Sequence, residues 1–274
     1  MKVAIIHDWF TWYSGAERVV ENIIKIIPNA DIYSSINTLS KNEQKFLNKK
    51  QVKVTFLQYF PWVSKFYKHY IILFPNCLES FNLSEYDLII SSSSSIAKGV
   101  KKTKNQIHIC YIHTPARYVW DLREQYLNEL NLNKWYNSPF VNFLLNRFKK
   151  WDLQNSKNVD YFISNSKFVQ SRVKTIYNRA SHVIYPPVNI NKFQLKIKKD
   201  NFYLAASRIV PYKKIKLIVE AFIDMPEKKL VVIGKGPGLK ELQNIATQNI
   251  KILGFQPFNI MHDYMKRAKA FVFA

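Results

Sequence analysis

Short runs of apolar residues alternate along the chain with longer segments that are apolar on one side only. The short runs predict buried strands at residues 3–6, 31–36, 52–56, 88–91, 107–112 and 161–164. Apolar residues spaced three or four positions apart predict helices at 16–27, 117–130, 140–154 and 167–177. Strands that alternate with helices are typical of a parallel sheet with helices on both faces. The sequence therefore predicts an α/β fold.

The alternation breaks near residue 190 and then starts again. The strand expected at 183–188 contains two prolines, and the polar, lysine-rich residues 189–200 are typical of a linker. Further strands are expected at 202–206, 229–233, 250–253 and 270–274, with helices at 214–223, 239–247 and 259–268. We predict a first domain at 1–188, a linker at 189–200 and a second domain at 201–274. Because no crossover helix follows the last strand, we expect the second domain to be incomplete.

Charge and cysteine content restrict the partners and the compartment. The formal net charge is +22, spread over both halves, which fits an anionic membrane, a phosphorylated substrate or nucleic acid. The joint richness in Lys, Asn and Ile also fits an AT-rich gene, which explains the charge without any partner. Two cysteines, Cys77 and Cys110, make neither a disulfide framework nor a four-ligand zinc site and fit a reducing cytoplasm. No apolar run approaches the roughly 20 residues of a membrane-spanning helix.

A cationic turn lies between the strand expected at 202–206 and the helix expected at 214–223. It carries Arg208, Lys213 and Lys214 in the segment Ser207-Arg208-Ile209-Val210-Pro211-Tyr212-Lys213-Lys214. Cations are unfavourable at a helix N-terminus, which carries partial positive charge. A bound phosphate would reverse that preference, and the other interpretation is a solvated run of charge. We expect Arg208 and Lys213 to reach one anionic site, with Lys214 and Lys216 in solvent.

Three other segments place residues that could bind a ligand in or beside a turn. Gly15 opens a helix in Ser14-Gly15-Ala16-Glu17-Arg18, where a glycine lets a ligand approach the backbone, although a plain loop glycine would look the same. His113 follows the strand at 107–112, where open α/β sheets bind ligands, or is a histidine held by loop backbone. Gly234, Gly236 and Pro237 form another strand-to-helix turn, whose spacing is not the dinucleotide fingerprint.

Two more features bear on partners. The aromatic, basic segment 59–70 fits a membrane interface or the edge of a buried helix. The sequence has no Asp-x-Asp triplet, no His-Glu-x-x-His and no His/Cys cluster, so it shows no ligand set for a metal-dependent transfer.

Together these motifs, in this order, resemble retaining family 4 glycosyltransferases of the GT-B architecture, in which two Rossmann-like domains face a cleft. The similarity covers essentially the whole chain and is greatest to bacterial mannosyltransferases of O-antigen and polysaccharide assembly. It is carried by His7-Asp8-Trp9 with Gly15-Ala16-Glu17-Arg18, His113-Thr114-Pro115 with Arg117-Tyr118 and Trp120-Asp121, Tyr185-Pro186-Pro187-Val188, Arg208 to Lys213, and Gly234 to Pro237. Ser14 stands where the family usually has a glycine, and the family's acidic donor motif would begin just after Ala274.

The resemblance implies roles for individual residues. The catalytic set would be His113, Arg208 and Lys213, with Arg208 and Lys213 stabilising the negative charge on the leaving nucleotide. Donor-binding residues would be Gly15, Arg208, Lys213, Gly234, Gly236 and Pro237. The acceptor side would comprise Gly15, Glu17, His113 and Arg117. No cofactor and no metal are expected beyond the nucleotide-sugar donor.

The resemblance thus implies transfer of a sugar with retention, with mannose from GDP-mannose as the expected donor. The expected acceptor is a lipid-linked or growing polysaccharide, at the inner face of the cytoplasmic membrane, with the protein in the cytoplasm or peripherally bound there. The alternative is an inactive fragment of the same fold that binds a nucleotide or an acceptor. A nucleic-acid-binding protein is a distant alternative, because the basic residues are dispersed and match no nucleic-acid module.

Overall fold

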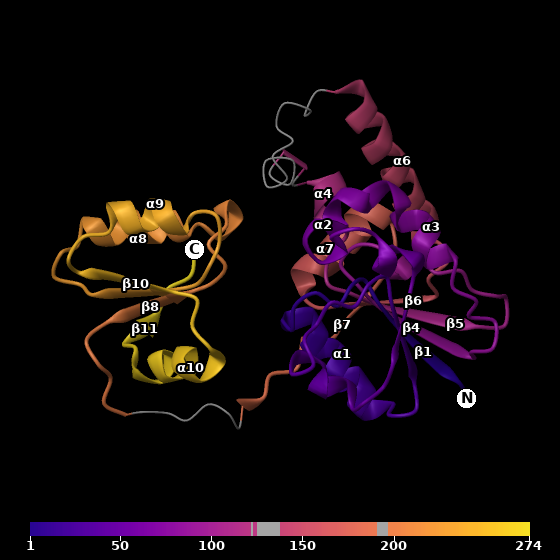
Figure 1. Ribbon diagram of the computed structural model, residues 1–274, viewed down its shortest axis with the longest axis horizontal. Helices are drawn as coiled ribbons and strands as arrows, with labels where there is room; N and C mark the ends of the chain where they lie inside the picture. The colour runs from indigo at the N-terminus through magenta and orange to yellow at the C-terminus, as the bar shows by residue number, and fades with distance from the viewer. Residues whose placement is uncertain (122, 125–137, 191–196) are drawn as a thin grey trace. The chain divides into compact units, whose positions relative to one another are not determined.

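The computed structural model describes residues 1–121, 123–124, 138–190 and 197–274, and it divides into two compact units (Figure 1). The units are Met1–Pro187 and Val188–Ala274. Each contains its own parallel sheet with helices on both faces, so the predicted α/β fold is confirmed. Part of the expected linker 189–200, residues 191–196, lies outside the described residues.

The first unit is built on a parallel sheet with the strand order β3-β2-β1-β4-β5-β6-β7. The strands are β1 (Val3–His7), β2 (Asp31–Ser34), β3 (Val52–Val54), β4 (Leu88–Ser93), β5 (Ile107–Ile112), β6 (Tyr161–Ser164) and β7 (His182–Val183). The order reverses between β1 and β4, which pair in register from Val3 opposite Leu88 to His7 opposite Ser92. In open α/β sheets, such a reversal leaves a crevice at the carboxyl ends of the two strands.

Helices cover both faces of this sheet (Figure 1). The described helices are α1 (Gly15–Ile26), η1 (Glu43–Leu47), η2 (Phe56–Tyr59), α2 (Val63–Phe66), η3 (Tyr67–Leu73), α3 (Phe74–Glu79), η4 (Ala97–Gly99), α4 (Arg117–Trp120), α6 (Pro139–Ser156) and α7 (Lys167–Tyr177). Val20 and Ile24 of α1 pack on Ile5 of β1. The opposite face buries Ile6 against residues of α3 and α6, including Cys77 and Phe148.

The second unit repeats the plan on a smaller scale, with the strand order β10-β9-β8-β11. Its elements are β8 (Tyr203–Ala206), η7 (Pro211–Lys213), α8 (Ile215–Ile223), β9 (Leu230–Ile233), α9 (Leu239–Ile245), β10 (Ile250–Gly254), α10 (Phe258–Arg267) and β11 (Ala270–Phe271). Helices α8 and α9 cover one face and α10 covers the other (Figure 1). Here the order reverses between β8 and β11.

Several elements are shorter than the sequence pattern predicts. The strand expected at 183–188 ends at Val183, because two prolines follow at Pro186 and Pro187 and cannot donate to a neighbouring strand. The helix expected at 117–130 is described only as α4 and residues 123–124, and residues 122 and 125–130 lie outside the described residues.

The helix expected at 214–223 begins one residue later, at Ile215. Lys214 has a left-handed backbone with φ of 50°, and residues 211–213 form a separate 3-10 turn. The expectation that Lys213 lies at the start of the long helix was therefore wrong: Lys213 ends the short turn instead.

Candidate active site

Polar side chains gather at the carboxyl ends of β1 and β4, at the reversal point of the first sheet. His7 ends β1 and is 2% exposed, and Glu17 in the first turn of α1 is 5% exposed. Nε2 of His7 lies 3.3 Å from Oε1 of Glu17. The other oxygen of Glu17 accepts hydrogen bonds from the backbone N–H and the hydroxyl of Ser14. Glu17 therefore caps α1 and holds His7 at the same time.

Five consecutive serines at the end of β4 each make a different side-chain contact. Ser91 Oγ lies 2.8 Å from Nε2 of the buried His108, and Ser92 Oγ lies 2.9 Å from Nε2 of His113. Ser92 Oγ also lies 3.2 Å from Nδ1 of His7. Ser93 and Ser94 donate to Asp8, and Ser95 bonds to Tyr118. Side-chain hydrogen bonds therefore hold the five serines in a fixed polar network.

Asp8 holds this segment in place from the end of β1. Its carboxylate is buried and accepts hydrogen bonds from the backbone N–H groups of Ser94, Ile96 and Ala97. Hydrogen bonds to a buried carboxylate are stronger than those between neutral groups. Asp8 therefore fixes the backbone between β4 and η4, and with it the position of Ser92.

His113 lies directly after β5, and its backbone N–H donates to the carbonyl of Ser93. Burial lowers the pKa of His113 to about 4, with a further contribution from the neighbouring His7. The imidazole is therefore neutral near pH 7, with one ring nitrogen as donor and the other as acceptor. Among the described residues, none bonds to its Nδ1 atom, so this nitrogen is available to a ligand.

The remaining predicted residues of the first unit divide into two groups. Gly15 begins α1, and a Cβ atom added there would meet no protein atom within 4 Å. Arg117 begins α4 and is partly exposed, with no carboxylate partner in the part of the chain that the structure describes. Gly15 therefore leaves room for a ligand at the start of α1.

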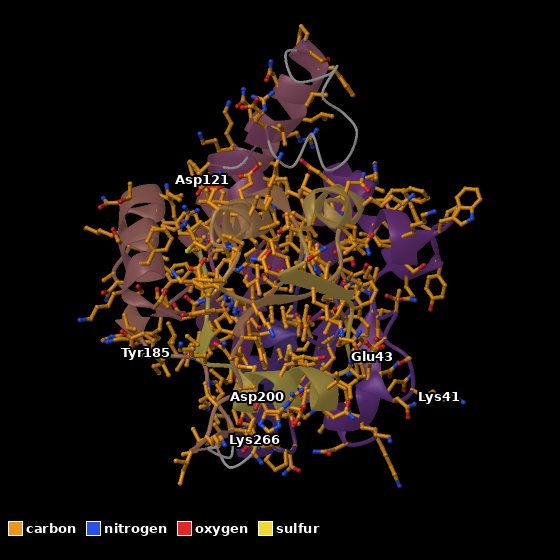
Figure 2. The ribbon with its side chains drawn as sticks, turned by 90° about the vertical axis from the view of Figure 1, so that its left-hand side faces the viewer. Lys41, Glu43, Asp121, Tyr185, Asp200 and Lys266 are labelled. Carbon is orange, nitrogen blue, oxygen red and sulfur yellow. The ribbon has the colours of Figure 1, made fainter. Side chains whose placement is uncertain are left out.

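Trp120 and Asp121, in contrast, hold the fold together. Trp120 Nε1 donates to the buried carboxylate of Asp152 on α6, at 2.8 Å. Asp121, which is labelled in Figure 2, accepts hydrogen bonds from Arg172 of α7. Lys98 and Tyr177 also donate to Asp152, which joins η4, α4, α6 and α7.

The cationic turn of the second unit lies at the reversal point of the second sheet, between the ends of β8 and β11. Arg208 is exposed, and Nζ of Lys213 lies 4.9 Å from the ring centroid of Phe273 after β11. Neither cation pairs with a carboxylate among the described residues. The backbone N–H of Lys213 donates to the carbonyl of Val210, which closes the turn. Two cations without counter-charge favour an anion here.

Gly234 and Gly236 are required by backbone packing. A Cβ atom at Gly234 would lie 1.9 Å from the carbonyl oxygen of Ser207, and one at Gly236 would lie 2.0 Å from that of Ile209. The backbone N–H of Ile209 donates to the carbonyl of Lys235. These glycines therefore press their loop against the cationic turn, a role that the sequence pattern alone did not separate from direct contact with a donor.

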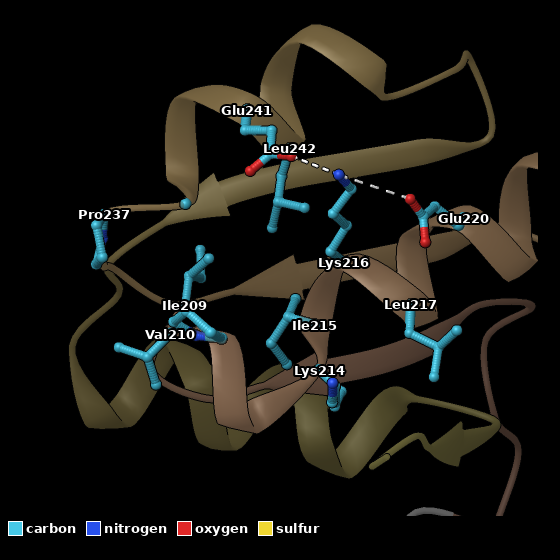
Figure 3. Close-up of a pocket in the computed structure, with 12 residues that line it drawn as sticks. Ile209, Val210, Lys214, Ile215, Lys216, Leu217, Glu220, Pro237, Glu241 and Leu242 are labelled. Atoms are coloured by element: carbon cyan, nitrogen blue, oxygen red, sulfur yellow. Dashed lines mark hydrogen bonds and ion pairs between the residues drawn. The ribbon is translucent and has the colours of Figure 1, made fainter. Parts of the chain in front are cut away.

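A cavity of about 690 Å³ opens next to this turn, between α8 and α9 (Figure 3). Pro237 and Lys214 line it together with apolar residues such as Ile215 and Leu242. Lys216 spans it by ion pairs to Glu241 and Glu220, at 2.6 Å and 3.8 Å. Arg208, Lys213, Gly234 and Gly236 do not line this cavity, so it adjoins the cationic turn without containing the two cations.

The described residues hold neither a metal cluster nor a membrane-spanning helix. Within the described ranges, no cluster of three His, Cys, Asp or Glu side chains could hold a metal ion. No helix in those same ranges is both long and apolar enough to cross a bilayer.

Comparison with known proteins identifies the architecture. The family model described as Glycosyltransferase Family 4 matches residues 13–192, and the model described as Glycosyl transferases group 1 matches residues 188–274. No curated protein matches the chain.

Solved structures match nearly the whole chain. Anabaena HepE, crystallised with UDP and glucose, is 17% identical, with a TM-score of 0.63 over 99% of this chain and 73% of that one. A variant of S. aureus TarM, crystallised with UDP and other ligands, is 11% identical, with a TM-score of 0.64 over 100% of this chain and 81% of that one. A glycosyltransferase from Rickettsia africae is 15% identical, with a TM-score of 0.54 and coverages of 100% and 73%. Similarity at this level shows a shared fold.

Several residues of the site escaped the sequence interpretation. Apart from Glu17 of α1, the side-chain partners of His7, Asp8 and Ser92 come from neighbouring strands or the loops that follow them, so no local spacing reveals them. The available signal was their position: each follows or ends an apolar strand, where the carboxyl ends of parallel strands meet.

Proposed function

The chain belongs to glycosyltransferase family 4, and we propose that it transfers a sugar from a nucleotide donor to a glycan or lipid-linked acceptor. This proposal rests on the side chains at the points where the strand order of the two sheets reverses. The reversal point of the first sheet holds a neutral His113 with a free ring nitrogen. The reversal point of the second sheet holds Arg208 and Lys213 without counter-charge. A group that can bind a sugar hydroxyl and a pair of cations that can bind a diphosphate suit transfer from a nucleotide sugar.

In this proposal, Arg208 and Lys213 bind the donor diphosphate and stabilise the charge that develops on the leaving nucleotide. Such electrostatic stabilisation is commonly the largest contribution to a reaction of this type. His113, Arg117 and the open space at Gly15 form the sugar and acceptor side, and Glu17 contributes there through its contact with His7. The bond between sugar and phosphate breaks with retention of configuration at the anomeric carbon, without a metal ion.

GDP-mannose is the first donor to test, and UDP-glucose is the second because a structure of similar fold was crystallised with UDP and glucose. Calorimetry with the whole chain should show binding of one nucleotide or nucleotide sugar, and Arg208→Ala and Lys213→Ala should each weaken it at least tenfold. Lys214→Ala, in the same turn, is the matched control and should bind as the parent does. Equal binding by all four proteins would overturn the assignment.

Turnover separates the enzyme from a binding protein of the same fold. Donor consumption and the anomeric configuration of the product can be followed by NMR with a short mannan or lipid-linked acceptor. Retained configuration with loss of about 2–4 kcal/mol of transition-state stabilisation in Arg208→Ala supports the proposal. Nucleotide binding without turnover of any donor would favour the alternative, a nucleotide-binding fragment.

An aromatic ridge on the first unit favours a membrane as the site of the acceptor. The ridge comprises Phe56, Tyr59, Trp62 and Phe66, all exposed, with Tyr59 at 83% and Trp62 at 76%. Trp62 has a left-handed backbone, with φ of 47°, directly before α2. Buried Leu57 and Val63 anchor the same segment in the core. Aromatic side chains on an anchored turn fit a bilayer interface.

The positive charge of this segment and of the whole chain favours an anionic bilayer. Lys65 lies within the ridge, and the chain as a whole carries +22. We infer peripheral binding to anionic lipid at the inner face of the cytoplasmic membrane, because cations near such a surface are attracted by its negative potential. Vesicles that contain phosphatidylglycerol should co-sediment with the protein more than phosphatidylcholine vesicles do. Tyr59→Ser and Trp62→Ser should lose binding, while Tyr161→Ser, which changes an exposed tyrosine elsewhere, should retain it. Equal vesicle binding by all three variants would contradict the role of the aromatic ridge in membrane binding.

A further inference from the structure

A continuous chain of contacts joins the start of α1 to His113, and it rests on the proposed role of His113 in holding the sugar or acceptor. The chain runs from Glu17 through His7 and Ser92 to His113, with successive distances of 3.3, 3.2 and 2.9 Å. Nε2 of His113 is engaged by Ser92, so only Nδ1 can meet a ligand. Whether Nδ1 accepts or donates a hydrogen bond therefore depends on the direction of the contacts behind it.

Glu17 sets that direction. Burial raises the pKa of Glu17, but the hydrogen bonds from His7 and Ser14 lower it below its ordinary value, so the group is a carboxylate. A carboxylate can only accept hydrogen bonds. When His7 carries a single ring hydrogen, that hydrogen is therefore on Nε2, and the Nδ1 atom is an acceptor.

We propose that Glu17 and His7 are positioning residues that fix the tautomer of His113 through Ser92. The hydroxyl of Ser92 donates to Nδ1 of His7, and its oxygen then accepts from Nε2–H of His113. Nδ1 of His113 is left with a lone pair, which accepts a hydrogen bond from a sugar hydroxyl. Asp8 is the other charged group near His113, and it is saturated by backbone N–H donors.

The hydrogen bonds of this chain can also run in the opposite direction, and one substitution should produce that arrangement. The carbonyl oxygen of Ser92 lies 3.2 Å from Nδ1 of His7 and would accept from an Nδ1–H group. In Glu17→Gln, the backbone N–H of Ser14 requires an acceptor, so the amide oxygen takes that side and the NH₂ group faces His7. His7 then donates to the Ser92 carbonyl, the Ser92 hydroxyl donates to Nε2 of His113, and Nδ1 of His113 carries the hydrogen.

Nitrogen NMR of the histidine side chains at pH 7 tests the relay directly, because ring nitrogens with and without hydrogen have well-separated chemical shifts. The parent protein should show His113 with hydrogen on Nε2, and Glu17→Gln should show it on Nδ1. Ser92→Ala should give a mixture. Ser91→Ala is the matched control: its partner is His108, so His113 should keep the parent tautomer. An unchanged His113 tautomer in Glu17→Gln would overturn the proposal.

Kinetics decide whether the relay serves the reaction. Glu17→Gln should lower kcat/KM about tenfold, the scale of one net hydrogen bond, while Ser91→Ala should change it less than twofold. The NMR result does not require turnover, so failure of the proposed sugar transfer and failure of the relay are separate outcomes. A reversed tautomer with unchanged kcat/KM would overturn the positioning role while leaving the proposed transfer intact.

Discussion

Gly15 and Gly234 both follow a strand and precede a helix, yet a methyl group would meet different surroundings at each. At Gly15 it would meet no protein atom within 4 Å. Gly15→Ala should therefore fold with an unchanged or slightly higher free energy of unfolding, because Ala favours a helix by up to about 1 kcal/mol over Gly. If a substrate approaches this backbone, kcat/KM should fall about tenfold or more, the effect of losing roughly 1.4 kcal/mol. Denaturant unfolding and donor turnover measure the two effects.

Gly234→Ala should instead lower the free energy of unfolding. Its Cβ atom would lie 1.9 Å from the carbonyl oxygen of Ser207, so one of two backbone segments must move. Overpacking of this kind costs about 1–3 kcal/mol in the free energy of unfolding. A stable Gly234→Ala, or a destabilised Gly15→Ala, would contradict the geometry on which the two roles were separated.

Two buried histidines should make stability depend on pH. Burial lowers the pKa of His108 to about 3 and that of His113 to about 4, against about 6.5 in an unfolded chain. Below pH 6.5 the unfolded chain therefore binds more protons than the folded protein, and stability falls as pH falls. Each histidine contributes a slope of about 1.4 kcal/mol per pH unit, down to its folded pKa.

Urea unfolding at pH 7, 6 and 5 measures this slope. His108→Gln removes one of the two groups and should make the decline shallower by about half. The contact with Ser91 can be kept by the glutamine amide, which makes this variant gentler than truncation. A free energy of unfolding that is constant between pH 7 and 5 would contradict the prediction.

At the scale of elements, one buried ion pair joins four helices of the first unit. Asp152 of α6 accepts from Lys98 of η4, Trp120 of α4 and Tyr177 of α7, and both charged side chains are at most 1% exposed. Asp152→Ala would leave the ammonium of Lys98 buried without counter-charge, which costs about 3–5 kcal/mol. Thermal or denaturant unfolding measures the loss. Glu85→Ala removes an exposed ion pair with Lys2 and should have no measurable effect.

The order of elements could be predicted from sequence because it depends on local patterns. Buried parallel strands appear as short apolar runs, and every strand expected in the first unit is present at its position, though β2, β3 and β7 end earlier than expected. The break between helix α8 and the turn before it could not be predicted, because the left-handed Lys214 depends on how Pro211 and Val210 close the turn. The partners of Ser92 and Asp152 were also hidden, since their side-chain hydrogen bonds join residues 21 or more positions apart.

At the scale of the whole molecule, the described apolar residues form separate cores in the two units. The clusters around Ile6, Val20 and Phe162 belong to the first unit, and those around Val219 and Leu204 belong to the second. No described cluster includes residues of both. Two cores of this kind favour two separate unfolding transitions, because cooperativity comes from shared packing.

A nucleotide that binds the cationic turn should therefore stabilise one transition and leave the other unchanged. At a concentration 100 times its dissociation constant, a ligand adds about 2.7 kcal/mol to the unit that binds it. For a unit as small as the second one, this corresponds to a rise of about 11–22 °C in its Tm. Calorimetry with GDP or UDP measures the shift, and Arg208→Ala should abolish it without altering the other transition. An equal shift of both transitions would show that the nucleotide is bound by both units. Asp152→Ala lowers the Tm of the first unit and so identifies its transition. A shift of that transition alone would place the nucleotide on the first unit.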